Sequence, residues 1–94
     1  MDFTADAVRQ FKKLPKAVRP AIKEAIRRHL VDENPAQTTG NRFRLRRVSP
    51  FADYELRDGD WRVFYRLEGD QVTITLLGEK RGNLLIVEGE QLSL

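Results

Sequence analysis

Arginines are the residues of this chain whose type and spacing could do chemistry. Arg62 lies in a run in which apolar and polar residues alternate, and Arg81 ends a Gly-Glu-Lys-Arg segment further along. A guanidinium stays charged at neutral pH and can bind two phosphate oxygens at once through parallel hydrogen bonds. These two arginines are therefore candidates to stabilise a negatively charged phosphate group.

Metal chemistry is a poor explanation for this sequence. The chain has no cysteine and a single histidine, His29, which excludes disulfides and thiolate zinc sites and disfavours a histidine-based metal site. We expect His29 to be packed near an apolar helix stripe rather than to act as a general acid. No metal and no small-molecule cofactor is expected.

The positive charge is unevenly distributed along the chain. The net charge is +3, but residues 1–31 carry eight lysines and arginines against three acids, whereas residues 58–94 carry four against seven. A basic surface on one part of the molecule indicates a polyanionic partner, with nucleic acid as the leading candidate. The alternative is that these side chains only solvate the exposed faces of helices.

Two N-terminal helices are predicted from apolar residues at helical spacing. Thr4 can cap the first, which runs to about Leu14, and the second is expected over about 16–31 with Pro20 in its first turn. The apolar stripes are Ala7, Val8, Phe11 and Leu14 in the first helix and Val18, Ile22, Ala25, Ile26 and Leu30 in the second.

From residue 42 the apolar period changes to two, which is typical of strands. Asp58-Gly59 and Gly69-Asp70 are hairpin signals, because these residues tolerate the backbone angles of tight turns. Segments 52–57, 61–67 and 72–76 should therefore form an antiparallel meander. Residues 84–87 are predicted to be an edge strand, and residues 88–94 a frayed tail.

The hairpin registers predict which side chains share a face of this sheet. One face is apolar enough to receive both helices, and the other is polar, with Phe64 exposed on it. A two-residue turn at Gly69-Asp70 places Arg62 opposite Leu77, which should bring Arg62 and Arg81 together. Glu55 lies cross-strand from Arg62, where a salt bridge is the simplest account. The apolar face holds Ala52, Tyr54, Leu56, Trp61, Val63, Tyr65, Leu67, Val72, Ile74 and Leu76, and the outer face holds Asp53, Glu55, Arg57, Asp60, Arg62, Phe64, Arg66, Thr73 and Thr75.

The predicted fold class is α+β, with two N-terminal helices packed on one face of a twisted antiparallel sheet in a single domain over residues 1–94. No apolar run approaches the roughly 20 residues needed to span a bilayer. The first residues also lack the apolar block of a signal peptide. We expect a soluble, cytoplasmic protein with no membrane partner.

Several of these features occur in a specific order: helix, Leu-Pro, helix, an Asn-Pro loop, the arginine-rich segment 42–47, the hairpin sequence YELRDGDWRVFY and then GEKR. The order resembles that of the RelE/ParE toxin superfamily and covers nearly the whole chain. As a member of this superfamily, the chain would begin with a strand, here shortened to residues 1–3.

The resemblance implies a toxin of a type II toxin-antitoxin pair that enters the ribosome and cuts mRNA, and that a cognate antitoxin holds inactive. The implied reaction is metal-independent: the RNA 2′-OH attacks its own phosphate, which needs a base, cationic stabilisation of the phosphorane and protonation of the leaving 5′-oxygen. The expected partners are thus the antitoxin, the ribosome and mRNA.

The resemblance also suggests site residues. Arg62 and Arg81 match the two arginine positions of the family, and some relatives use a glutamate base on the face that carries Glu55. We therefore expect Arg62, Arg81 and Glu55 to be catalytic. The residues expected to contact nucleic acid are Arg44, Arg46, Arg47, Arg57, Phe64, Arg66 and Lys80.

Departures from the family pattern leave two other functions open. Asp53 and Glu55 occupy the strand that carries paired lysines in RelE, and the apolar stretch 84–87 replaces the expected C-terminal tyrosine. One alternative is a ParE-like toxin that inhibits DNA gyrase without chemistry. The other is an inactive relative that only binds the antitoxin and operator DNA.

Overall fold

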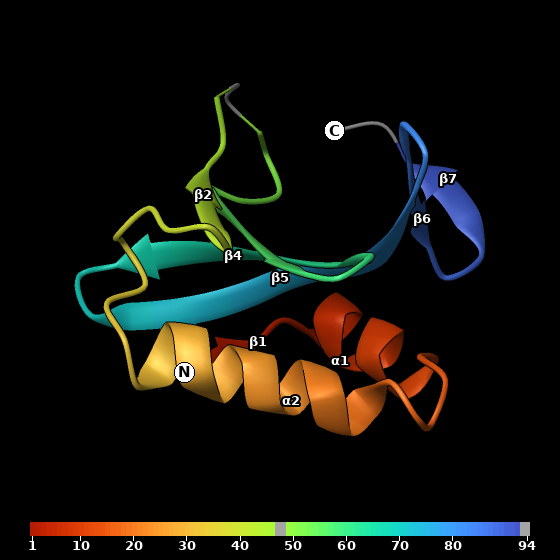
Figure 1. The fold of residues 1–94 in the computed structure, drawn as a ribbon, viewed down its shortest axis with the longest axis horizontal. Helices are drawn as coiled ribbons and strands as arrows, with labels where there is room; N and C mark the ends of the chain where they lie inside the picture. Colours follow the sequence, from red (N-terminus) through yellow and green to blue (C-terminus); the bar gives the residue numbers. More distant parts are fainter. Residues whose placement is uncertain (47–48, 93–94) are drawn as a thin grey trace.

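The computed structural model describes residues 1–46 and 49–92. It confirms the α+β class, with two helices lying against one face of a mostly antiparallel sheet (Figure 1). The helical segments are α1 (Ala5–Lys12), α2 (Arg19–Ile26) and the π-helical turn η1 (Arg27–Val31) that continues α2. The strands are β1 (Asp2–Phe3), β2 (Arg42–Arg44), β3 (Tyr54–Asp58), β4 (Trp61–Glu68), β5 (Gln71–Arg81), β6 (Leu84–Val87) and β7 (Glu90–Leu92).

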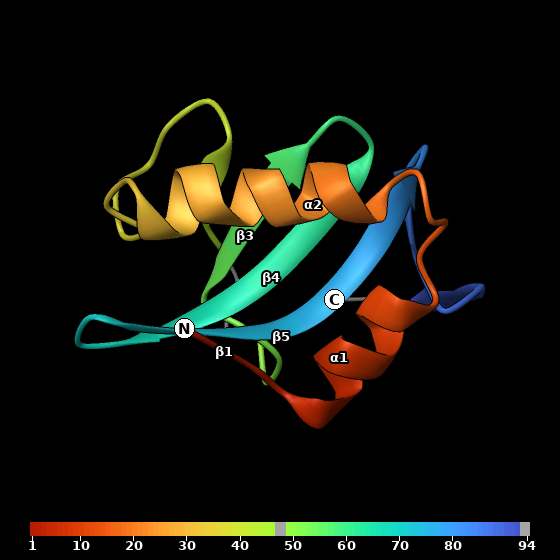
Figure 2. The ribbon, with the colours of Figure 1, turned by 90° about the horizontal axis from the view of Figure 1, so that it is seen from below.

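Strand β5 organises the sheet. The strand order is β2-β3-β4-β5-β6-β7, with β1 outside this path. One edge of β5 pairs with β4, while its other edge pairs with β1 near the start of the strand and with β6 near its end. The β1 pairing is parallel and the others are antiparallel. Figure 2 shows β4 and β5 curving together, with α2 lying across them and α1 beside β5.

Helix α1 closes the part of β5 that lies between these two partners. Thr4 caps the helix as predicted, since its hydroxyl accepts a hydrogen bond of 3.1 Å from the Ala7 amide. Gln10 is 6% exposed, and its Oε1 accepts a bond of 2.8 Å from the Leu77 amide. Val8 is 38% exposed, so its predicted place in the apolar stripe is wrong. Gln10 points inward because the Leu77 amide needs an acceptor.

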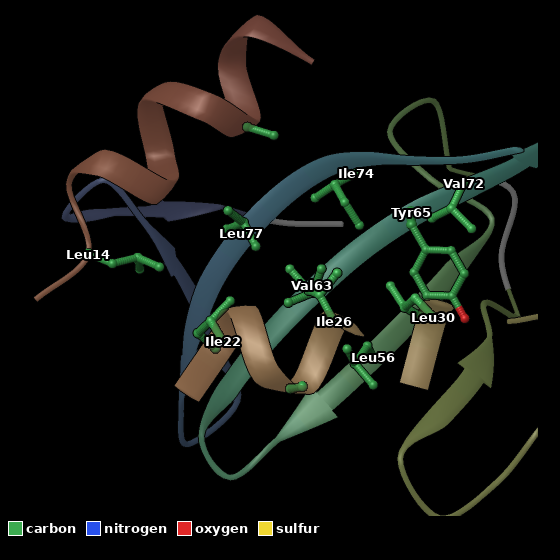
Figure 3. Packing of buried hydrophobic residues seen from close by; sticks show 12 residues of the cluster. Leu14, Ile22, Ile26, Leu30, Leu56, Val63, Tyr65, Val72, Ile74 and Leu77 are labelled. Carbon is green, nitrogen blue, oxygen red and sulfur yellow. The ribbon is translucent and has the colours of Figure 1, made fainter. Parts of the chain in front are cut away.

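Helix α2 and the η1 turn contribute Ile22, Ala25, Ile26 and Leu30 to the buried core. Helix α2 begins at Arg19, later than expected, and Pro20 lies in its first turn as predicted. The helical path continues through η1 to residue 31, where the Asp32 amide donates to the Arg27 carbonyl at 2.9 Å. Figure 3 shows the buried core that forms between this segment and the sheet, with the side chains of Leu14, Ile22, Ile26, Leu30, Leu56, Val63, Tyr65, Val72, Ile74 and Leu77.

Tyr65 has a polar atom within this core. Its hydroxyl donates a hydrogen bond of 2.7 Å to the Pro35 carbonyl, which satisfies the group without water. Burial raises the pKa of the Tyr65 hydroxyl well above its usual range, because the anion would lose its hydration. The expectation that Tyr65 is a core residue is confirmed.

The first hairpin of the meander has the predicted register. Asp58 pairs with Trp61, and Gly59 has a φ of 58°, which glycine adopts without strain. The second hairpin also begins as predicted, with Glu68 opposite Gln71.

A β-bulge at Thr75 then changes the register. Tyr65 pairs with Ile74, but the next pair is Phe64 and Leu76, so Thr75 has no partner on β4. An unpaired residue shifts every later side chain to the other face of the strand. The predicted register is therefore correct before the bulge and wrong by one residue after it.

The shift creates a second, smaller apolar cluster on the face away from the helices. Its buried members are Ala52, Phe64, Leu76 and Val87. Phe64 is 1% exposed, because residues of β6 and β7 pack against this cluster. The predictions that Phe64 is exposed and that Ala52 and Leu76 face the helices are wrong. Leu76 is turned over by the bulge, and Ala52 precedes the regular part of β3.

The C-terminal segment is more ordered than expected. Residues 84–87 form β6, as predicted, but β6 is not an edge strand because β7 pairs with it through Val87 and Glu90. Glu88 and Gly89 have φ values of 54° and 80° and make the connecting turn. The predicted frayed tail is thus wrong for residues 88–92, and residues 93–94 lie outside the described part of the chain. Across the two described ranges, no helix combines the length and apolar character needed to cross a membrane.

Candidate nucleic-acid interface

A groove on the outer face of the sheet, with a volume of about 130 Å³, gathers half of the predicted site residues. Its charged lining comes from Glu55 and Arg57 on β3, Arg62 on β4 and Lys80 on β5. The remaining lining residues are Phe64, Asn83, Leu84 and Leu85. We call this cavity the arginine groove.

Strand register explains why the cations meet here. Arg57 lies directly opposite Arg62, and Arg62 lies opposite Gly78 on β5. Lys80 is two residues beyond Gly78 and therefore projects from the same face. Two like charges in a cross-strand pair repel each other unless an anion lies between them. The arginine groove is therefore electrostatically suited to a phosphate group.

Gly78 allows the wall of this groove to come close. A Cβ atom at this position would lie 2.8 Å from the Ile86 carbonyl oxygen and 3.0 Å from Leu85 Cδ1. The contact with the backbone oxygen is too short for a real Cβ atom. Strand β6 can therefore pack against β5 opposite Arg62 only because residue 78 is glycine.

The expected salt bridge between Glu55 and Arg62 is wrong. Glu55 instead pairs with Arg57, whose Nε lies 2.5 Å from Oε1 of Glu55. The Arg57 guanidinium also lies 4.2 Å from the centre of the Phe43 ring. Arg62 donates from Nη1 to two turn carbonyls, that of Gly59 at 2.7 Å and that of Trp61 at 2.9 Å.

Arg62 and Arg81 do not converge on one site, contrary to the prediction. The bulge turns Arg81 to the face that carries Trp61 and Glu79, where its Nε donates to Glu79 at 2.7 Å. Lys80 takes the expected place of Arg81 beside Arg62. The sequence indicated both residues but could not show the bulge that exchanges them.

The other predicted nucleic-acid contacts are dispersed. Arg44 lies on the helix-facing side, where Nη1 donates to the Tyr54 hydroxyl at 3.0 Å. Arg66 donates to the Pro50 carbonyl, and Arg46 is exposed. Arg47 lies outside the described residues. None of the three described side chains lines the arginine groove.

Comparison with known families is consistent with this architecture. The model of the ParE toxin of the type II toxin-antitoxin system parDE matches residues 1–82, which is most of the chain. The chain belongs to the ParE toxin family. No curated protein and no solved structure matched it. Membership of this family implies an antitoxin partner.

The ParE-family match ends at Gly82, and β6 and β7 follow it. This C-terminal hairpin is not peripheral, because Leu84 and Leu85 line the arginine groove and Val87 is buried in the outer cluster. Part of the candidate site of this ParE-family toxin is therefore built by residues outside the matched region.

One arginine of this ParE-family chain has a structural role that the sequence did not reveal. Arg42 is 2% exposed and donates from Nη1 to the His29 carbonyl at 2.6 Å and to Glu33 at 2.9 Å. Its Nε donates to the Gln37 carbonyl at 3.0 Å. These bonds join β2 to the end of the helical segment, which leaves Arg42 unavailable for nucleic acid. His29 is mostly buried beside this network, in agreement with a packed histidine.

The acidic and histidine side chains are too dispersed for a metal centre in the part of the chain that the structure describes. No group of three or more His, Cys, Asp or Glu residues is placed there to hold an ion. The arginine groove has a single carboxylate, Glu55, among three cations. This charge balance favours an anionic ligand over a metal ion.

Proposed function

We propose that this toxin of a type II toxin-antitoxin pair cuts ribosome-bound mRNA in the arginine groove. The observation that supports the proposal is the gathering of Glu55, Arg57, Arg62 and Lys80 around one cavity. A carboxylate beside three cations offers both a proton acceptor and a binding site for a phosphate.

The reaction assigns a separate task to each side chain. Glu55 accepts the proton of the RNA 2′-OH, whose oxygen then attacks the adjacent phosphorus. Arg57 and Arg62 stabilise the added negative charge on the phosphorane oxygens. The bond from phosphorus to the 5′-oxygen breaks, and Lys80 gives a proton to that oxygen. The products are a 2′,3′-cyclic phosphate and a free 5′-hydroxyl.

Arg57 has a second task in this proposal, because it already pairs with Glu55. The ion pair orients the carboxylate on the groove wall, and the ring of Phe43 limits how far the guanidinium can move. Arg81 is not part of this reaction, since it lies on the other face of the sheet.

The partners follow from the proposed reaction. The toxin would meet mRNA on the ribosome in the cytoplasm, and the antitoxin would cover it until release. An acidic antitoxin segment would complement the basic N-terminal part of the chain, whose residues 1–31 carry a net charge of +5 from eight cations and three acids.

Gyrase inhibition is the second candidate function. The ParE family match favours it, and so does the engagement of Arg62 with turn carbonyls rather than with Glu55. In that case the arginine groove would bind a partner surface without chemistry. A protein that only binds its antitoxin and operator DNA would show neither activity.

The decisive experiment is cell-free translation of an end-labelled mRNA with wild type, Arg62→Ala and the matched control Arg28→Ala. Arg28 is an exposed arginine on η1, away from the groove. We expect discrete cuts with 2′,3′-cyclic phosphate ends from wild type and Arg28→Ala, and their loss in Arg62→Ala. Intact mRNA with wild type, together with inhibition in a gyrase supercoiling assay, would contradict the proposed nuclease activity and support gyrase inhibition.

A further inference from the structure

A second and larger cavity lies on the helix-facing side of the same sheet end. It has a volume of about 540 Å³ and is bordered by the end of α1, the ends of β4 and β5, and the β6–β7 hairpin. Figures 1 and 2 show this hairpin at the same end of the molecule as the turn between α1 and α2. We call the cavity the hairpin pocket. Its size is within the range that accommodates a small organic ligand.

The wall of the hairpin pocket offers an aromatic surface. Trp61 is partly buried against the helix-facing core and also lines the pocket. Leu14, Leu77 and Ile86 add apolar surface around it. An indole ring in a half-open wall is suited to stacking with a planar base.

Two cations border the same pocket. Arg81 uses its Nε to bind Glu79, and its side chain remains 67% exposed, so its terminal amino groups can reach a ligand. Lys13 is 59% exposed and lies 3.9 Å from Glu88. A guanidinium and an ammonium near one aromatic ring are the groups that recognise a phosphate attached to a base.

The carboxylates of the pocket do not cancel this preference. Glu79 is paired with Arg81, and Glu88 accepts a hydrogen bond of 2.7 Å from Nε of Arg9. Their charges are therefore compensated by neighbouring arginines. Each carboxylate still has acceptor positions for the amino group of a base, and the amide nitrogen of Gln10, which also lines the pocket, can donate.

We propose that the hairpin pocket binds one nucleotide of a single-stranded RNA, with the base against Trp61 and the phosphate at Lys13 and Arg81. The identity of the polymer rests on the proposed function, whereas the preference for a nucleotide rests on the pocket alone. This site gives Arg81 a role in RNA binding that is separate from the arginine groove.

Strand geometry connects the two sites. Trp61 and Arg62 are adjacent residues whose side chains lie on opposite faces, and the same holds for Arg81 and Lys80. An RNA strand that passes around this end of the sheet can therefore contact both the arginine groove and the hairpin pocket.

Trp61 is the only tryptophan of the chain, so its fluorescence reports on this pocket directly. The probes are adenosine monophosphate and a 2′-O-methyl adenosine trinucleotide, which cannot be cut because its attacking hydroxyl is blocked. We expect saturable quenching of the Trp61 emission by both. Arg81→Gln and Lys13→Gln should each weaken binding by about tenfold, as expected for the loss of one charge-assisted phosphate contact. The exposed control Arg28→Gln should bind as wild type does.

Three results would overturn the proposal: no saturable quenching, equal affinity in wild type and both pocket variants, or equal quenching by inorganic phosphate alone. Circular dichroism checks that Arg81→Gln remains folded, and Lys13→Gln provides the test if it does not. The two proposals fail separately. Quenching by adenosine monophosphate without mRNA cleavage would contradict the proposed nuclease activity and support nucleotide binding in the hairpin pocket. Cleavage without quenching would support the nuclease activity and contradict nucleotide binding in the pocket.

Discussion

The two faces of the sheet differ in how they use arginine. On the helix-facing side, Arg42 is buried and all its described contacts are with the protein. On the outer side, Arg57 and Arg62 face each other across two strands beside an open groove. Arginine thus joins structural elements at position 42 and presents charge to a ligand at positions 57 and 62. We infer that stability and binding are largely separable in this molecule.

The largest expected effect is on the helix-facing core. Leu56 is fully buried between α2 and the sheet, so Leu56→Ala should lower the free energy of unfolding by about 3 to 4 kcal/mol through lost burial and a residual cavity. Urea unfolding followed by circular dichroism measures it. A loss below about 1 kcal/mol would show that this face is less well packed than its burial indicates.

Removal of the buried arginine should have the next largest effect. Arg42→Met keeps the bulk of the side chain but leaves the carbonyls of His29 and Gln37 without their donor, at a cost of about 2 to 3 kcal/mol. The same unfolding experiment measures it. RNA cleavage below the unfolding temperature should persist, and its selective loss in folded protein would move Arg42 into the functional site.

Arg57→Ala tests the opposite behaviour on the outer face. It removes the pairing with Glu55 and the contact with the Phe43 ring but also the repulsion from Arg62, so the free energy of unfolding should fall by only about 0.5 to 1 kcal/mol. Cleavage should nevertheless fall by about a hundredfold, since one phosphate-stabilising donor is lost. Primer extension on translated mRNA measures the cleavage. An equal loss of stability in Arg57→Ala and Leu56→Ala would contradict the separation of the two faces.

The smallest expected effect is at the exposed end of α2. A hydrogen bond from Arg27 lowers the pKa of Glu24 below its usual value of 4.5. A carboxyl with a depressed folded pKa stabilises the fold above the unfolded pKa and loses that contribution as the pH falls through the folded pKa. Glu24→Gln should therefore flatten the loss of thermal stability below about pH 4.5 and change little at pH 7. Melting curves across this pH range measure the difference.

The sequence was sufficient for the elements that follow local rules. Thr4 caps α1, Pro20 lies in the first turn of α2, and Gly59 forms the first hairpin turn, because each depends on the chemistry of a few neighbouring residues. The position of Arg62 on the outer face of the sheet was also predictable, because successive side chains of a strand alternate between the two faces.

The composition of the candidate site was not predictable to the same degree. The bulge at Thr75 depends on how the whole of β5 packs, and no local signal distinguishes Thr75 from Thr73. It exchanged Arg81 for Lys80 in the groove and buried Leu76. The structural role of Arg42 was not predictable either, since an alternating pattern does not show which arginine donates to carbonyl groups of a helix distant in sequence.

The shared edge of β5 has a consequence for folding kinetics. The β4–β5 pairing closes through a two-residue turn, whereas β1 joins the same strand through Phe3 and Ile74, which are distant in sequence. Closing so long a loop is entropically costly, so this contact should form late in folding and open early in native fluctuations. The Thr4 amide, which bonds to the Ile74 carbonyl at 2.9 Å, should accordingly exchange its hydrogen faster than the amides between β4 and β5.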